Sequence, residues 1–244
     1  MQKVSFTIKI IGQPPPDLDI ASIRRRKSKL WSIPRDPETF SLSENTDLDG
    51  WGFSDDLLNR IISKDTSTNV TFCILNVPLE DNYYSRRIDT NVVCLTFFEI
   101  AEILRHHNIP QVNAIYRMLY SFTLIYRRRQ ESIPPTHTLY HYAHHEARGC
   151  IFDMNGIKSE IIHSCHEPKL CNECQTDSIR DRVSNEFLKT FQTEIKTIRK
   201  TLFFRAADFI KAHPVLALLI SSIFAILLGT TGSLIASLIY ERIK

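Results

Sequence analysis

The chain has 244 residues, enough for one domain of ordinary size or two small ones. Its formal net charge of +3 gives no reason to expect nucleic acid as a partner. The first residues lack the continuous apolar core of an export signal, so the six cysteines favour reduced thiols or metal ligands over a disulfide framework.

The N-terminal part of the sequence predicts a small mixed sheet. Residues 1–11 alternate polar side chains with the apolar side chains of Val4, Phe6, Ile8 and Ile10, which is the period of a strand. Buried strands are also expected at 70–77 and 91–97. The segment 13–50 is rich in Pro, Ser and charge without a sustained period, which predicts a long loop.

Helices are expected to pack on this sheet. Apolar residues at helical spacing predict one helix from Asp55, a short helix over 99–107 and a longer one after Pro110. Arginines 127–129 follow the longer helix, where positive charge is favourable against the helix dipole. The predicted fold class is therefore α+β, with one soluble domain over 1–175.

A basic cluster occupies residues 24–29 of the predicted loop and is followed by Leu30 and Trp31. We interpret the cluster as part of a solvated loop, and contact with anionic lipid is the alternative. Cys73 and Cys94 lie in apolar runs, where a cysteine usually behaves as a small core residue.

The segment 141–175 carries the strongest signal for chemistry. Cys171 and Cys174 form a CxxC, and Cys150 precedes them within reach of a folded-back loop. Three thiolates and an imidazole complete a tetrahedral zinc set, so we expect a structural zinc ion on Cys150, Cys171, Cys174 and His144. For the fourth ligand the other donors remain open: His145, His163, Cys165 and His166. Metal-free thiols or a redox pair are the alternative to zinc.

The cysteines also carry a resemblance. Residues 150–160, CIFDMNGIKSE, and residues 168–174, PKLCNEC, resemble the tail of archaemetzincin-like zinc metalloproteases, in which cysteines ending in CxxC hold a second, structural zinc. The order of elements over about 69–175 is similar as well. Those proteases use an HExxH motif, and this chain has none, because His145-Glu146 lacks the second histidine. The resemblance therefore implies a structural zinc site without the family's catalysis.

A second metal site is an alternative reading of the same region. His141 and His145 are spaced i, i+4, with His137 one turn earlier, so they could share a metal on one helical face. Such an unconventional site would make the chain a metallohydrolase. We prefer to interpret these histidines as polar surface.

The C-terminal part predicts a membrane anchor. Residues 176–212 are charged, with apolar residues every three or four positions, which predicts an amphipathic helix or a stalk. The run from Pro214 to Tyr240 contains no charged residue and exceeds the ~20 residues that cross a bilayer, so we place a single transmembrane helix at 213–240, before a short tail at 241–244. Basic residues concentrate before the span, so the N-terminal domain is expected to be cytosolic.

Small residues recur at every fourth position of the span, which predicts self-association of the anchor: Ala217, Ser221, Ala225, Gly229, Ser233 and Ser237. The sequence as a whole predicts a tail-anchored, zinc-stabilised binding or regulatory protein without catalytic activity. The alternatives are a membrane-tethered metallohydrolase with an unconventional His site and an effector that acts through oligomerisation of its transmembrane helix.

Overall fold

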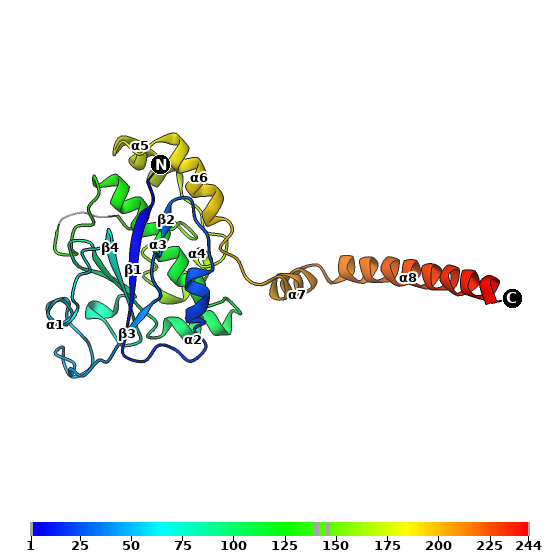
Figure 1. Ribbon diagram of the computed structural model, residues 1–244, viewed down its shortest axis with the longest axis horizontal. Coiled ribbons are helices and arrows are strands. Elements are labelled where there is room, and N and C mark those ends of the chain that lie inside the picture. Colours follow the sequence, from blue (N-terminus) through cyan, green and yellow to red (C-terminus); the bar gives the residue numbers. More distant parts are fainter. Residues whose placement is uncertain (1, 139–141, 145–146, 244) are drawn as a thin grey trace. The chain divides into compact units, whose positions relative to one another are not determined.

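The computed structural model describes residues 2–138, 142–144 and 147–243. The chain divides into two compact units, Met1–Arg199 and Lys200–Lys244. The strands of the described residues all lie in the first unit together with most of the helices, and the second unit contains α7 (Leu202–Ala212) and α8 (Pro214–Ile243) (Figure 1).

A six-stranded mixed sheet lies at the centre of the first unit, in the order β2-β1-β4-β6-β5, with β3 also paired to β1. Strands β1, β4 and β6 run parallel to one another, and β5 runs antiparallel to β6. The strand bounds are Val4–Ile11 (β1), Trp31–Ser32 (β2), Glu38–Phe40 (β3), Val70–Leu75 (β4), Ser85–Asp89 (β5) and Val92–Thr96 (β6).

Helices cover this sheet, so the α+β class predicted from the sequence is confirmed. The longest helix of the first unit is α3, Val112–Arg128, which begins shortly after Pro110 as expected. The other helices and 3-10 turns of this unit are η1 (Ile20–Arg24), α1 (Asp55–Ile61), η2 (Glu80–Asn82), α2 (Ile100–His106), η3 (Lys158–Glu160), α4 (Ile161–Ser164), α5 (Asn172–Arg180) and α6 (Asn185–Ile195).

Alternate residues of the central strands enter two separate hydrophobic cores. The larger core contains Phe6 and Phe72 with α3, where the rings of Phe72 and Phe122 are 6.1 Å apart between centroids. The smaller core lies on the other face and joins α1 to Cys73 and Cys94. Both cysteines are fully buried and are register partners across β4 and β6, which confirms their predicted core role.

The segment 13–50 differs from the single long loop that its composition suggested, because it contains η1, β2 and β3. Trp31 is only 2% exposed and its ring contacts that of Tyr120 on α3. Arg26 lies over the rings of Tyr116 and Tyr120 and donates a hydrogen bond of 2.9 Å to the carbonyl of Glu194. The basic cluster is therefore not a fully solvated loop, because Arg26 contacts the tyrosine rings of α3 and is hydrogen-bonded to α6.

The range 176–212, for which the sequence suggested one amphipathic helix, contains the end of α5, then α6 and then α7. The chain turns between α5 and α6 at Arg182, whose φ is 65°, and Ser184 caps the start of α6 by accepting from the N–H of Phe187. The apolar side of α6 is buried in the larger core through Phe187, Leu188, Phe191 and Ile195.

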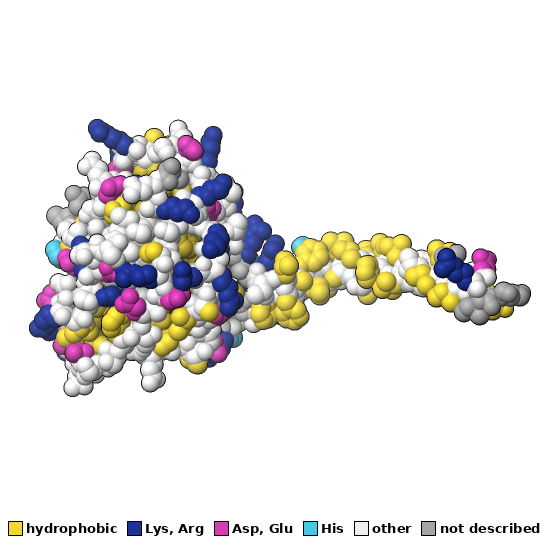
Figure 2. Space-filling model, viewed as in Figure 1, with side chains coloured by type: hydrophobic (Ala, Val, Ile, Leu, Met, Phe, Trp, Pro, Cys, Tyr) yellow, Lys and Arg dark blue, Asp and Glu magenta, His cyan; other side chains and the backbone are white. Residues whose placement is uncertain are grey.

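In the second unit, α8 is long and apolar enough to cross a membrane by length and composition, with a mean hydropathy of 2.2 over the best window of Pro214–Arg242. None of that window is buried. Figure 2 shows hydrophobic side chains covering the visible side of α8, with charged side chains only near its end. This helix matches the apolar span predicted from the sequence.

Candidate metal centre

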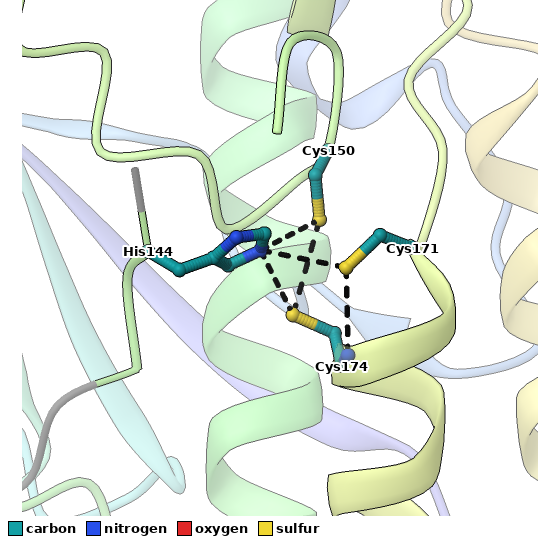
Figure 3. Close-up of side chains that lie close together, drawn as sticks. All are labelled: His144, Cys150, Cys171 and Cys174. Carbon is teal, nitrogen blue, oxygen red and sulfur yellow. Dashed lines mark hydrogen bonds between the residues drawn. The ribbon is translucent and has the colours of Figure 1, made fainter. Parts of the chain in front are cut away.

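Four metal-binding side chains converge on one point in the first unit: His144, Cys150, Cys171 and Cys174 (Figure 3). Their ligand atoms all lie within 4.8 Å of one another. The His144 Nε2 atom is 3.1 Å from Sγ of Cys174, 3.4 Å from Sγ of Cys150 and 3.5 Å from Sγ of Cys171. A tetrahedral zinc ion with Zn–S of about 2.3 Å and Zn–N of about 2.0 Å has ligand atoms about 3.5–3.8 Å apart. The cluster therefore fits one four-coordinate ion.

Helix α5 supplies two of the four ligands from its first turn. Cys171 is the N-cap residue, and its Sγ accepts a hydrogen bond of 3.4 Å from the N–H of Cys174. The CxxC spacing thus places both sulfurs at the start of the helix. Unpaired N–H groups and the positive end of the helix dipole favour negative charge there, which stabilises thiolates.

The other two ligands belong to the folded-back segment before α5. His144 is held by two backbone hydrogen bonds, from its N–H to the carbonyl of Phe152 and from the N–H of Met154 to its own carbonyl. These bonds hold His144 beside Phe152 and Met154, so its imidazole lies close to the thiol of Cys150.

A bend at Gly149 directs Cys150 toward the cluster. Gly149 has a φ of 82°, and a Cβ at this position would lie 3.3 Å from the carbonyl oxygen of His163. Lys169 pairs with this stretch through backbone hydrogen bonds to Gly149 and Ile151, which joins it to the chain entering α5. Backbone freedom at Gly149 and this pairing together position the third thiol.

The thiols of the cluster influence one another's pKa. The sulfurs of Cys150 and Cys174 are 3.9 Å apart and share a hydrogen bond, which lowers the pKa of Cys150 and raises that of Cys174. One thiolate is thereby already favoured inside a nearly buried cluster. A bound divalent cation would lower the pKa of the other thiols, because its positive charge stabilises each thiolate.

Of the alternative fourth ligands, Cys165 lies outside the cluster. It is fully buried, and burial raises the pKa of its thiol to about 12, so it stays neutral. Among the described residues, the metal-binding group includes neither His163 nor His166. His145 lies outside the described residues, as does His141 of the proposed second site, and His137 is exposed. The structure brings together the four residues favoured from the sequence, and their binding of zinc stays a prediction.

One residue beside the cluster was missed by the sequence analysis. Arg117 stands on α3 and is 1% exposed, and its guanidinium donates to the carbonyl of Asp153, three residues after Cys150. The signal was present in the sequence, since a single arginine interrupts the apolar stretch from Val112 to Tyr126.

Comparisons with known proteins give no family for this chain. No family model matches it, and no curated protein matches it. One solved structure with similarity is a zinc-dependent peptidase from Methanocorpusculum labreanum, at a TM-score of 0.35 and 11% identity, covering 70% of this chain and 99% of that one. The resemblance to zinc peptidases is distant, and neither the fold nor an activity of this chain follows from it.

Proposed function

We propose that this chain is a membrane-anchored, zinc-stabilised binding or regulatory protein without hydrolytic activity. The observation that supports the proposal is the set of four protein ligands at one point. Structural zinc sites are closed by four protein ligands, whereas catalytic sites use three and keep one position for water. A cluster of three thiols and an imidazole leaves no such position.

Metal content tests this proposal directly. We expect the full-length protein, purified in detergent, to contain one zinc ion per chain that survives dialysis against a weak chelator. Elemental analysis of the dialysed protein measures this. One ion per chain matches a closed structural site, whereas a further exchangeable metal that restores hydrolysis would favour the metallohydrolase with an unconventional His site. Protein without any metal would contradict the proposal.

The membrane part of the proposal rests on α8 and on the charges beside it. Basic residues near a span are retained on the cytosolic side. Five of them precede the span in the sequence, Lys196, Arg199, Lys200, Arg205 and Lys211, against Arg242 and Lys244 after it. We therefore propose a single-pass protein whose N-terminal unit faces the cytosol.

Self-association of α8 is the second role we propose for the anchor. Small side chains at every fourth position let two helices approach closely, so van der Waals packing drives association where the hydrophobic effect cannot. Gly229 stands in the middle of this series, and a Cβ added there meets no atom of the chain within 4 Å. A larger side chain at this position is therefore tolerated by the single helix and obstructs only a second one.

We expect Gly229→Leu to reduce association of the anchor at least several-fold in an in-membrane dimerisation reporter. Leu227→Ile is the control, because it changes neither the volume nor the series of small residues. Equal signal for wild type and Gly229→Leu would remove these residues as the basis of association. Loss of the signal in both variants would show a dependence on α8 as a whole and equally contradict the mechanism.

A further inference from the structure

A cavity of about 290 Å³ lies between β5, α3 and the segment that carries His144 and Cys150. This volume is near the lower end of the range for small-molecule sites, which is roughly 300–1,000 Å³. Much of its wall is apolar or aromatic, with contributions from Tyr83, Tyr84, Phe122, Tyr142 and Phe152. A wall of this kind, with a few polar groups among the rings, is typical of a ligand pocket.

Arg117 is the most deeply buried charge in this cavity. Its described partners are the carbonyl of Asp153 at 3.2 Å, the sulfur of Met118 and the ring of Tyr84, none of which is a carboxylate. Within the described part of the chain, its Nε has no hydrogen-bond acceptor. The guanidinium stays charged, because arginine does not lose its proton in proteins. A buried guanidinium without a carboxylate among its described partners favours an anionic ligand.

Two other charged side chains of the wall, Arg87 and Asp153, indicate which chemical groups an anionic ligand would carry. Arg87 reaches the cavity from β5, with its guanidinium 4.9 Å from the ring centroid of Tyr142. Asp153 is 3% exposed, and its Oδ2 has no donor among the described residues. Arg86 adds no net charge, because it is paired with Asp55 and with further carboxylates of η2. The wall therefore includes the guanidinium groups of Arg117 and Arg87 and the carboxylate of Asp153, and Arg87 also donates a hydrogen bond of 3.0 Å to the carbonyl of Pro134.

From this arrangement we infer that the cavity binds a small aromatic organic phosphate. Arg117 and Arg87 hold the phosphate, since guanidinium groups pair with phosphate oxygens through parallel hydrogen bonds. The tyrosines hold the planar ring, and Asp153 accepts a hydrogen bond from a hydroxyl or amino group of the ligand. The inference specifies the ligand of the binding role proposed above and rests on that role.

The metal centre and the cavity share one segment of chain. Phe152, Asp153 and Met154 line the cavity, and the backbone of His144 is hydrogen-bonded to Phe152 and Met154. A cation held by His144 and Cys150 therefore fixes the wall that carries Asp153. Because ordering a wall in advance removes part of the entropy cost of binding, zinc removal is expected to weaken ligand affinity.

Calorimetric titration of the zinc-loaded, full-length protein in detergent tests the inference, with adenosine 5′-monophosphate and the smaller phenyl phosphate as probes. We expect at least one of them to bind, and adenosine and inorganic phosphate, which lack the charge or the ring, to bind at least tenfold more weakly. Arg117→Met and Arg87→Gln should each lower affinity at least tenfold. Arg25→Gln is the matched control, because its exposed side chain pairs with Asp19 outside the cavity and its loss should leave affinity unchanged.

Arg87 is only half-buried, so Arg87→Gln keeps the test valid if Arg117→Met fails to fold. The inference is overturned if neither phosphate binds the zinc-loaded wild type at millimolar concentration, or if Arg87→Gln binds as tightly as wild type. Zinc content measured on the same sample separates the two proposals. One zinc ion per chain without phosphate binding removes the ligand and leaves the zinc-stabilised domain intact.

Discussion

Replacing Cys174 by serine is expected to remove the metal from the protein and to unfold or aggregate its first unit. Binding of zinc to a structural site contributes folding free energy, with apparent values of about 10–16 kcal/mol in small zinc domains. Whole domains are stable by only about 5–15 kcal/mol. Cys174 is 3% exposed within the larger hydrophobic core, so losing the ion also leaves the thiol of the buried Cys150 without its cation.

Elemental analysis and thermal unfolding of the full-length variant in detergent measure this effect. Cys165→Ala is the matched control, because Cys165 is equally buried in the same core but lies outside the cluster. The control should keep one zinc ion per chain and lose about 1–2 kcal/mol for the small cavity it leaves. Zinc bound at wild-type level by Cys174→Ser, or its loss from Cys165→Ala, would show that the ligand set is a different one.

The four residues of the candidate metal cluster could be predicted from the sequence because cysteine and histidine are rare and their spacing is chemically restrictive. A CxxC at the start of a helix places two thiols together by local geometry alone. The proximity of His144 to the three thiols depends on backbone pairing of His144 with Phe152 and of Lys169 with Gly149 and Ile151, which spacing does not reveal. Spacing alone could not exclude Cys165, whose burial keeps it neutral.

Several buried elements were also predictable. Strand β1 alternates polar and apolar residues, β4 and β6 are largely apolar, and α3 has apolar residues at helical spacing. Strand β5 was missed because Ser85–Asp89 reads SRRID, which is typical of an exposed loop. Its buried Arg86 is acceptable only because Asp55 on α1 accepts hydrogen bonds from it at 2.7–3.0 Å, and that partner is distant in sequence. A hydrophobicity pattern cannot predict that a charged residue is buried when its ion-pair partner is distant in the sequence.

The prediction of one long loop over 13–50 was incomplete for the same reason, because distant residues order part of the segment. Its Pro and Ser content correctly indicated little regular structure, but Trp31 and Arg26 are ordered by α3 and α6, which come much later in the chain. Likewise, the turn at Arg182 divides the expected C-terminal amphipathic helix although every apolar residue of α6 obeys the helical period. The spacing of apolar residues predicts which face of a helix is buried but does not predict where the helix ends.

Placing two arginines in the middle of α8 is expected to release the protein from membranes. Between Val215 and Ile239 the helix has fourteen Leu, Ile, Val and Phe residues, each worth about −0.3 to −0.6 kcal/mol for insertion at the helix centre, for a total of about −4 to −8 kcal/mol. One central arginine costs about 2.5–3.5 kcal/mol, so the pair Ile223→Arg and Leu227→Arg cancels most of the gain. Both side chains are exposed on α8, at 60% and 56%, so the change removes no packing within the chain.

Alkaline extraction of isolated membranes measures the effect, because it strips peripheral proteins and leaves those that span the bilayer. Wild type and the apolar control Ile223→Leu with Leu227→Ile should stay in the pellet, while the double arginine variant should move to the supernatant with one zinc ion per chain. Retained zinc would show that the first unit is still folded, so that the release reports on α8 alone. If the arginine variant remains in the pellet with zinc bound, then α8 does not anchor the protein and the attachment must lie in the first unit.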